Sequence, residues 1–343
     1  MSYQIDPVTG SAEECEELAQ FLADFIRDGE GPTGDAREQT CELWLTRIRG
    51  WWETNPFCGE NSPRGLIVRT TEGKIVGFYG YIPHDYVHEG KVIRGLIATT
   101  SYVRAAHRGA ALPLFMKAHR HEIDFHYTDG APNKAIYPIL ERFGYHQRGS
   151  AKMHVYPVSA SLSNPVRWAT GAARLLTSSP GDLPEEGKII TDPMEATSCA
   201  DFPDSQLRRE ISLESLSWYL QSGSDPRYFV GWCDAYGVLQ CYLLGFVRQK
   251  SVVDALVVAD YAFATGAPEG LLDRLVARVA KYPSRFQLPD SVSLVVWATC
   301  DDDLICSTPF TRKFDPRLFY RLPKSASDVN RQDLPFEGDH IFQ

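Results

Sequence analysis

The sequence lacks the marks of a membrane or secreted protein. It has no run approaching the roughly 20 apolar residues that a membrane-spanning helix needs. Its opening stretch, MSYQIDPVTGSAEECEEL, has neither the basic nor the apolar region of a secretory signal peptide. These absences predict a cytoplasmic protein with no membrane partner.

Metal-binding and redox cysteine motifs are also missing. No two cysteines form a C-x-x-C pair, and the eight cysteines are scattered over positions 15, 41, 58, 199, 233, 241, 300 and 306. Without a secretion signal, a chain of this size is expected to keep its thiols reduced. The histidines of HRHEIDFH, at positions 119, 121 and 126, match no metal-ligand spacing, so we expect no bound metal.

The chain has no basic surplus. Its formal net charge is -9, whereas a nucleic-acid-binding protein usually carries a basic patch or a high isoelectric point. We therefore expect no nucleic-acid partner. An acidic chain is compatible with a cationic or amine substrate, although whole-chain charge bears on solubility more than on any one site.

What is present is a regular alternation of helices and strands. At 343 residues the chain exceeds the size of about 250–300 residues at which single cores stop growing. Over residues 1–157 the periodicity predicts, in order, helices at 12–28 and 36–55, a hairpin at 64–82, a strand at 91–103, a helix at 111–122, a strand at 123–129, a helix at 131–143 and a strand at 144–157. This order predicts an α/β fold on one mixed sheet.

The second half repeats this order loosely. Residues 158–208 are rich in Ser, Pro and Gly, which predicts a linker or irregular crossover. Residues 209–343 then show a hairpin, a strand, a helix, a strand, a short helix from Asp301 and a strand over 313–323. We predict two domains of similar architecture, 1–157 and 209–343, joined by the segment 158–208.

The stretch AAHRGAALPLF, residues 105–115, joins a strand to a helix through an Arg-Gly turn. The first turn of a helix presents unpaired N–H groups and the positive end of the helix dipole, which favour a phosphate. Arg104 and Arg108 add positive charge there. The alternative is purely structural: Gly109 simply permits a tight strand-to-helix turn.

In this stretch the chain resembles the GNAT superfamily of acyl-CoA-dependent acyltransferases. That family reads L-x-V-x-P-x-x-R-G-x-G-x-G/A here, and Val103, Arg108 and Gly109 fall on the pattern. Ala111 and Pro113 replace the two later glycines, and proline has no N–H to donate. The resemblance implies two GNAT-like modules, each a mixed, mostly antiparallel sheet flanked by helices.

The resemblance also implies the residues of an acyl-CoA site. The N–H groups of Gly109, Ala110, Ala111 and Leu112 would bind the pyrophosphate, beside Arg104 and Arg108. The N–H of Tyr102 or Val103 would bind the thioester oxygen, which is oxyanion-type stabilisation. Acetyl-CoA, or another acyl-CoA, is the expected co-substrate.

A second family motif, N-x-x-A-x-x-L-Y-x-x-x-G-F, is partly matched. Asn133 is followed eleven residues later by Gly144 and Tyr145, and the resemblance implies that Asn133 hydrogen-bonds the pantetheine arm. The alternative is an Asn that caps a helix which Gly144 ends. The family's tyrosine position is Leu140 here, and the strand at 91–103 has threonines and a serine where the family often carries a glutamate base. Tyr137, one helical turn before Leu140, is our candidate for the missing acid; the alternative is a tyrosine of the core.

We therefore predict an acyltransferase that moves an acetyl or other short acyl group to a small amine, such as an amino sugar or amino acid derivative. The second half would be a degenerate module that shapes the acceptor site. We expect it to bind no coenzyme, because Asp260 and Glu269 place negative charge near its helix and no arginine answers them. Two alternatives are an aminoacyl transferase like the Fem peptidoglycan enzymes, which take aminoacyl-tRNA, and a non-catalytic GNAT-fold binding protein.

Overall fold

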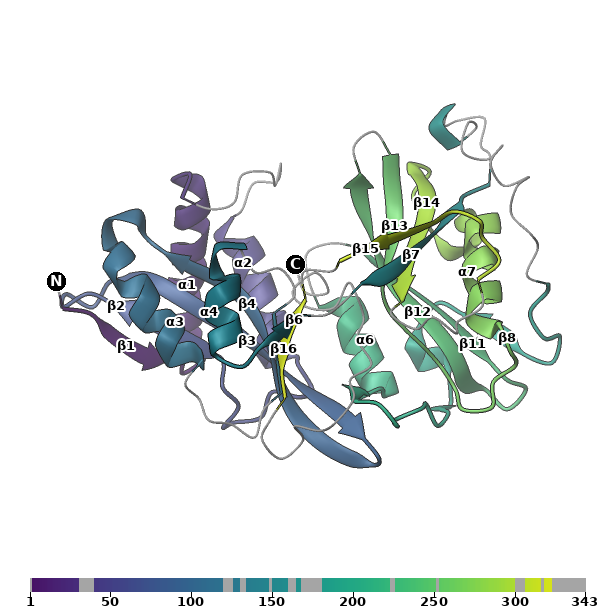
Figure 1. Cartoon of the computed structure of the whole chain (residues 1–343), viewed down its shortest axis with the longest axis horizontal. Coiled ribbons are helices and arrows are strands. Elements are labelled where there is room, and N and C mark those ends of the chain that lie inside the picture. Colours follow the sequence, from purple (N-terminus) through teal and green to yellow (C-terminus); the bar gives the residue numbers. More distant parts are fainter. Residues whose placement is uncertain are drawn as a thin grey trace.

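The computed structural model places the chain in two lobes, each built on an eight-stranded mixed sheet (Figure 1). It describes residues 2–30, 40–119, 126–129, 134–147, 150–159, 165–167, 181–222, 226–250, 253–299, 306–315 and 318–322. Two such sheets flanked by helices are the fold class that the sequence predicted.

The first sheet has the order β1-β2-β3-β4-β5-β16-β6, and β10 pairs with β3 at one side. All its neighbouring strands are antiparallel except β4 and β5, which are parallel. Its strands are β1 (Gln4–Pro7), β2 (Gly65–Arg69), β3 (Ile75–His88), β4 (Lys91–Val103), β5 (His126–Asp129), β6 (His146–Gln147), β10 (Arg208–Arg209) and β16 (Phe319–Arg321).

The second sheet has the order β15-β7-β14-β13-β12-β11-β8, with β9 beside β12. Here too a pair in the middle, β13 and β14, is parallel, and so is the short pair of β9 with β12. Its strands are β7 (Ala151–Pro157), β8 (Lys188–Ile190), β9 (Ser198–Cys199), β11 (Arg227–Cys233), β12 (Val238–Lys250), β13 (Val253–Phe263), β14 (Val292–Thr299) and β15 (Thr311–Phe314).

Helices cover both faces of the first sheet. The helix α1 (Ala12–Arg27) starts where the Ser11 side chain accepts the N–H of Glu14, and it packs a buried apolar face with α2 (Cys41–Ile48) and η1 (Arg49–Glu53). The other face carries η2 (Ala105–Ala110), α3 (Ala111–His119), η3 (Lys134–Ile136) and α4 (Tyr137–Arg142).

In the second lobe, α7 (Leu271–Lys281) and η6 (Pro283–Phe286) cover one face of the sheet. The opposite face turns toward the first lobe and toward α6 (Leu213–Gln221), which is preceded in the chain by η5 (Pro193–Glu195). The helix predicted in the second half is present as α7, and the Leu271 and Leu275 side chains on its apolar face are buried.

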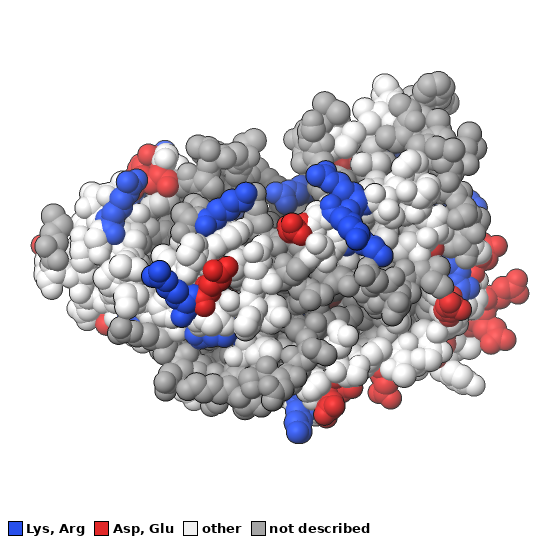
Figure 2. Space-filling model, in the orientation of Figure 1, with Lys and Arg blue, Asp and Glu red and all other residues white. Residues whose placement is uncertain are grey.

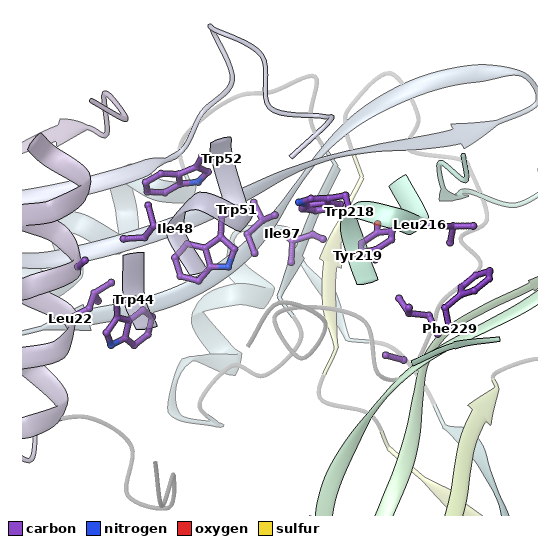
Figure 3. Packing of buried hydrophobic residues seen from close by; sticks show 14 of the residues in the cluster. Leu22, Trp44, Ile48, Trp51, Trp52, Ile97, Leu216, Trp218, Tyr219 and Phe229 are labelled. Atoms are coloured by element: carbon purple, nitrogen blue, oxygen red, sulfur yellow. The ribbon is translucent and has the colours of Figure 1, made fainter. Parts of the chain in front are cut away.

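One hydrophobic core runs from the first lobe into the second (Figure 3). Trp44 of α2 and Trp51 and Trp52 of η1 lie between α1 and α6, and Trp218 and Tyr219 of α6 continue the cluster toward the second sheet. The Trp218 Nε1 donates to the carbonyl oxygen of Gly50 at 2.7 Å. The tryptophans near position 50 are therefore core residues that join the lobes.

The two sheets also exchange strands. The strand predicted over residues 144–157 is in fact β6 in the first sheet and β7 in the second, and the strand predicted over 313–323 is likewise β15 in the second sheet and β16 in the first. Prediction of each as one strand is wrong. At the crossing, the Ser150 hydroxyl donates to Asp315 Oδ1 at 3.0 Å.

The segment 158–208 is more than a connection. It supplies β8, which pairs with β11, and β10, which pairs with β3 of the first sheet. Ser, Pro and Gly content alone gave no sign of these short strands. The division into domains at residues 157 and 209 stays a prediction; it assigns β7 to the first domain and β16 to the second, although each strand pairs in the other sheet.

Candidate functional site

The parallel pair in the first sheet separates into a fork. The register of β4 with β5 runs from Gly95↔His126 to Ala98↔Asp129, and within the described residues β5 ends there while β4 continues to Val103. Although β4 is an interior strand, Ser101 is exposed at this point. The fork therefore leaves an accessible edge on β4.

A β-bulge lies at the base of the fork. Opposite β3, Tyr79 pairs with Ser101 and Gly80 with Thr99, so Thr100 is an extra residue with a positive φ of 32°. A β-branched residue rarely adopts positive φ, and such strain concentrates at functional sites. Gly80 is required opposite it, because a Cβ there would lie 2.8 Å from side-chain atoms of Phe78 and Thr99.

The bulge decides which backbone groups face the fork. The Arg104 N–H donates to the Val76 carbonyl oxygen at 2.9 Å, and Gly77↔Val103 and Phe78↔Tyr102 continue the same register. Because N–H groups alternate in direction along a strand, that of Tyr102 points toward β3 and that of Val103 points toward the fork. Of the two predicted thioester donors, the geometry favours Val103.

Side chains alternate in the same way. The Tyr102 ring stacks on Phe25 of α1 at 4.6 Å between ring centroids, with 7° between the planes. Val103 packs on the opposite face, with the cluster that includes α3 and α4. Ser101, two residues from Val103, shares that face.

The Arg-Gly stretch is helical, and several of its residues are exposed to solvent. It forms η2 and runs directly into α3. Gly109 is exposed, and a Cβ added to it would find no heavy atom within 4 Å. Ala110 is buried, Leu112 is 56% exposed, and the Ala111 N–H already donates to the carbonyl oxygen of Arg108. Of the predicted pyrophosphate donors, Ala111 is thus engaged within the helix.

The two arginines of this stretch differ in their surroundings. Arg104 Nη1 lies 2.7 Å from Asp28 and 3.1 Å from Glu30, which tie it to the end of α1. The Ala105 N–H also donates to Glu30, and this bond, followed by that of Arg104, lowers the pKa of the Glu30 carboxyl. Arg108 is exposed and, among the described residues, forms no ion pair. It is the cation that remains available at the turn.

The helix α4 places Tyr137 against a strand from the far end of the chain. The Tyr137 ring contacts Phe319 of β16 at 4.6 Å between centroids, and within the described part of the chain its hydroxyl has no hydrogen-bond partner. Leu140, at the family's tyrosine position, is fully buried, so a tyrosine there would overpack the core. Asn133 lies outside the described residues.

A polar cluster that the sequence did not indicate lies near the ends of α3 and α4. His119 Nδ1 and the Tyr145 hydroxyl are 2.8 Å apart, and burial lowers the pKa of His119 to about 3. Arg321 of β16 donates through Nη1 to the carbonyl oxygens of His119, at 3.1 Å, and Phe143, at 3.3 Å. Its guanidinium also lies over the Tyr145 ring, 5.2 Å from the centroid. No sequence spacing links position 321 with the ends of these helices.

The second sheet repeats the bulge and the fork. Leu244 pairs with Asp260 and Gly245 with Val258, which leaves Ala259 as an extra residue on β13, and the register of β13 with β14 ends at Val257↔Val296. The side chain that follows this bulge, however, is buried against another part of the protein.

Asp260, directly after this bulge, forms a buried ion pair with Arg209. Arg209 Nη2 and Asp260 Oδ1 are 2.9 Å apart, and the side chains are 4% and 5% exposed. The Tyr242 hydroxyl donates to Asp260 Oδ2 at 2.9 Å. The argument that no arginine answers Asp260 is therefore wrong: Arg209 is far away in the sequence, but the fold brings it alongside.

Other expectations concern metals, disulfides and membranes. Among the described residues, no group of three or more His, Cys, Asp or Glu side chains could hold a metal ion. The seven described cysteines are free. None of the described helices combines the length and apolar character needed to cross a membrane.

On the face in Figure 2, the described basic side chains lie in separate groups with acids between them. Asp301 and His121 lie outside the described residues.

No protein-family model and no curated protein matches the sequence, but solved structures match the fold. A conserved protein of unknown function from Enterococcus faecalis V583, described as a probable N-acyltransferase, has a TM-score of 0.57 at 10% identity, over 95% of this chain and 74% of that one. A GCN5-related N-acetyltransferase from Anabaena variabilis has a TM-score of 0.54 at 13% identity, with the same coverages of 95% and 74%.

The N-myristoyltransferase of Saccharomyces cerevisiae, solved with bound myristoyl-CoA, is also similar. Its TM-score is 0.50 at 12% identity, over 99% of this chain and 83% of that one. Identities this low speak to the fold alone. The chain has the GNAT fold, and the resemblance predicted from the sequence is confirmed at that level.

Proposed function

We propose that this protein is an acyl-CoA-dependent N-acyltransferase and that the fork of the first sheet holds the thioester. The observation that carries the proposal is the edge of β4 beyond its pairing with β5, where a bulge turns the Val103 N–H away from β3 and the neighbouring Ser101 is exposed. A fixed N–H aimed at a thioester oxygen stabilises the negative charge that develops there during acyl transfer.

The turn that follows β4 supports a pyrophosphate site. The space over Gly109 is open, Arg108 is exposed, and the turn lies directly after the thioester donor in the chain. Gly109 and Leu112, which are exposed, remain the donors to test, while Ala110 is buried at the end of η2 and Ala111 is engaged in the helix. Arg104 would act indirectly, by fixing the turn to α1 through Asp28 and Glu30.

Acyl-CoA is the proposed co-substrate, and acetyl or another short acyl group is the proposed cargo. The similar yeast enzyme was solved with myristoyl-CoA, which supports acyl-CoA as the class of donor. A small amine is the proposed acceptor, and the second lobe would line its site because the two lobes share one core beside α1 and α2. Tyr137 is the proposed acid for the departing thiolate.

A non-catalytic coenzyme-binding protein is the second candidate. It is favoured by the buried Leu140 at the position where the family has a tyrosine, and by the absence of a carboxylate on β4 beyond the fork. In that case the chain would bind acyl-CoA with no transfer to any amine. An aminoacyl transferase of the Fem type gains no support from the observed geometry.

The test of the site is calorimetry on a series of glycine variants. Because the space over Gly109 is open, Gly109→Asp should fold normally, and its charge should weaken acetyl-CoA binding by about tenfold or more through repulsion of the pyrophosphate. Gly109→Ala should bind more nearly as the wild type does. The control is Gly59→Asp, which adds the same charge at an exposed glycine with ordinary contacts.

Two results would count against the proposal. One is the absence of wild-type binding at millimolar acetyl-CoA, and the other is equal binding by Gly109→Asp and the wild type. Myristoyl-CoA, titrated in parallel, tests the acyl length: tighter binding of the long chain than of acetyl-CoA would contradict a short acyl cargo.

A further inference from the structure

The only hydroxyl that β4 exposes inside the fork belongs to Ser101. This residue directly follows the bulge and is exposed, whereas Thr99 before the bulge is 5% exposed. Within the described part of the chain the Ser101 hydroxyl has no hydrogen-bond partner, unlike Thr99 and Thr100, whose hydroxyl oxygens lie 3.4 Å apart. A serine that is exposed on an interior strand and is not used by the fold is free to contact a ligand.

The bulge places Ser101 next to the proposed thioester donor. If Thr100 were an ordinary residue of the strand and not a bulge, the alternation of β4 would turn Ser101 toward the face that α1 covers. With it, Ser101 and Val103 share one face and one edge, about 7 Å apart from Cα to Cα. An oxygen that accepts the Val103 N–H from the fork therefore lies within reach of a serine hydroxyl two residues away.

We propose that the Ser101 hydroxyl is a second donor to the thioester oxygen and acts together with the Val103 N–H. This inference rests on the proposed function. As the amine nitrogen bonds to the carbonyl carbon, the C=O electron pair moves onto the oxygen, where both donors stabilise it. When the carbonyl re-forms, the C–S bond breaks and its electron pair leaves on sulfur. The amine proton passes to solvent, the thiolate takes a proton from the proposed acid Tyr137, which regains one from solvent, and Ser101 keeps its own.

This role compensates for what β4 lacks. The strand carries no carboxylate beyond the fork, so no group on it can take the proton of the amine at close range. Stabilising the charged oxygen is then the largest contribution that β4 can make. Loss of one donor of this kind typically lowers kcat by about 10²–10³-fold.

The first experiment needs no knowledge of the acceptor. Acetyl-CoA labelled with ¹³C at the carbonyl is bound to the protein, and the infrared frequency of that carbonyl is measured. Two donors polarise the bond and lower the frequency relative to free acetyl-CoA. In Ser101→Ala we expect part of this shift to be lost, in Ser101→Thr we expect it to be retained, and in the control Ser198→Ala, an exposed serine on β9, we expect no change.

The second experiment measures thiol release from acetyl-CoA with hydroxylamine as a small nucleophile. Ser101→Ala should lower kcat by about 10²–10³-fold while the Kd of acetyl-CoA stays nearly constant, because a transition-state donor contributes little to ground-state binding. Ser101→Thr should restore most of the rate. Unfolding midpoints should agree among the variants, since Ser101 is exposed.

The outcomes separate the two proposals. If calorimetry detects no acetyl-CoA on the wild type, the proposed function fails and the role of Ser101 fails with it. If the wild type binds acetyl-CoA and Ser101→Ala shows the same carbonyl frequency and the same rate, only the role of Ser101 is overturned.

Discussion

Arg321 should stabilise the first lobe although it comes from the last strand of the structure. Its guanidinium donates to the last carbonyl groups near the ends of α3 and α4, at His119 and Phe143, where helices leave carbonyl oxygens unpaired. Hydrogen bonds from a charged donor contribute about 1.5–3 kcal/mol each, and half-burial of the side chain reduces that. We expect Arg321→Ala to lower the free energy of unfolding by about 2–3 kcal/mol.

Urea unfolding followed by tryptophan fluorescence measures this loss. The matched control is Arg312→Ala, which removes an exposed arginine from β15 in the same terminal segment and should change stability by less than about 0.5 kcal/mol. Hydrogen exchange should be faster at the ends of α3 and α4 in Arg321→Ala. Equal stability of the two variants, or unchanged exchange in both helices, would refute the assignment of Arg321 as a clamp.

Two further predictions concern single groups. Tyr137→Phe should lower kcat by about 10²–10⁴-fold if its hydroxyl is the acid, with coenzyme affinity and unfolding midpoint nearly unchanged because the ring contact with Phe319 is kept; an unchanged rate would exclude Tyr137 from the reaction. His119 is held neutral, because burial lowers its pKa from 6.5 to about 3. The unfolded chain therefore binds a proton that the folded chain does not, and stability should fall as the pH drops from 6.5 toward 3, by at most about 1.4 kcal/mol per pH unit. His119→Gln should show a shallower fall in urea titrations at pH 7, 6, 5 and 4, and parallel pH profiles would contradict this.

The parts of the fold that depend on local pattern could be predicted from the sequence. The helices predicted over 12–28 and in the second half are present as α1, which the Ser11 side chain caps, and α7, whose apolar face is buried. The hairpin predicted around Gly73 is present as β2 and β3, with Gly73 at a positive φ of 85°. In each case the deciding interactions lie within a few residues of one another.

The exchange of strands could not be predicted, because it depends on contacts between distant segments. Phe319 lies in register with Asp129 and with Gln147, and nothing in the residues after 313 shows which sheet they join. Periodicity reports that a strand has a buried face but not which partner covers it. For the same reason, the sequences of α3 and α4 did not indicate that Arg321 donates to carbonyl groups near their ends.

The candidate site was predictable in outline and not in detail. The Arg-Gly turn pointed to the segment of the proposed site, yet the choice between Tyr102 and Val103 required the bulge at Thr100, which reverses the alternation of β4. A bulge depends on the register of the opposing strand, where Gly80 makes room for it. The sequence of β4 alone shows neither the bulge nor the glycine on the opposing strand.

The forks of the two sheets share one architecture but differ in the residue that follows the bulge. Both sheets have a bulge opposite a glycine, Gly80 in the first and Gly245 in the second, and both parallel pairs separate beyond it. After the first bulge stands an exposed serine, whereas after the second stands Asp260, whose charge is buried against Arg209. Removing one partner of such a pair would leave an uncompensated buried charge. The two side chains therefore stay paired, and a ligand cannot reach Asp260. Because the second bulge is filled in this way and the first is open, we expect one acyl-CoA site per chain, in the first sheet.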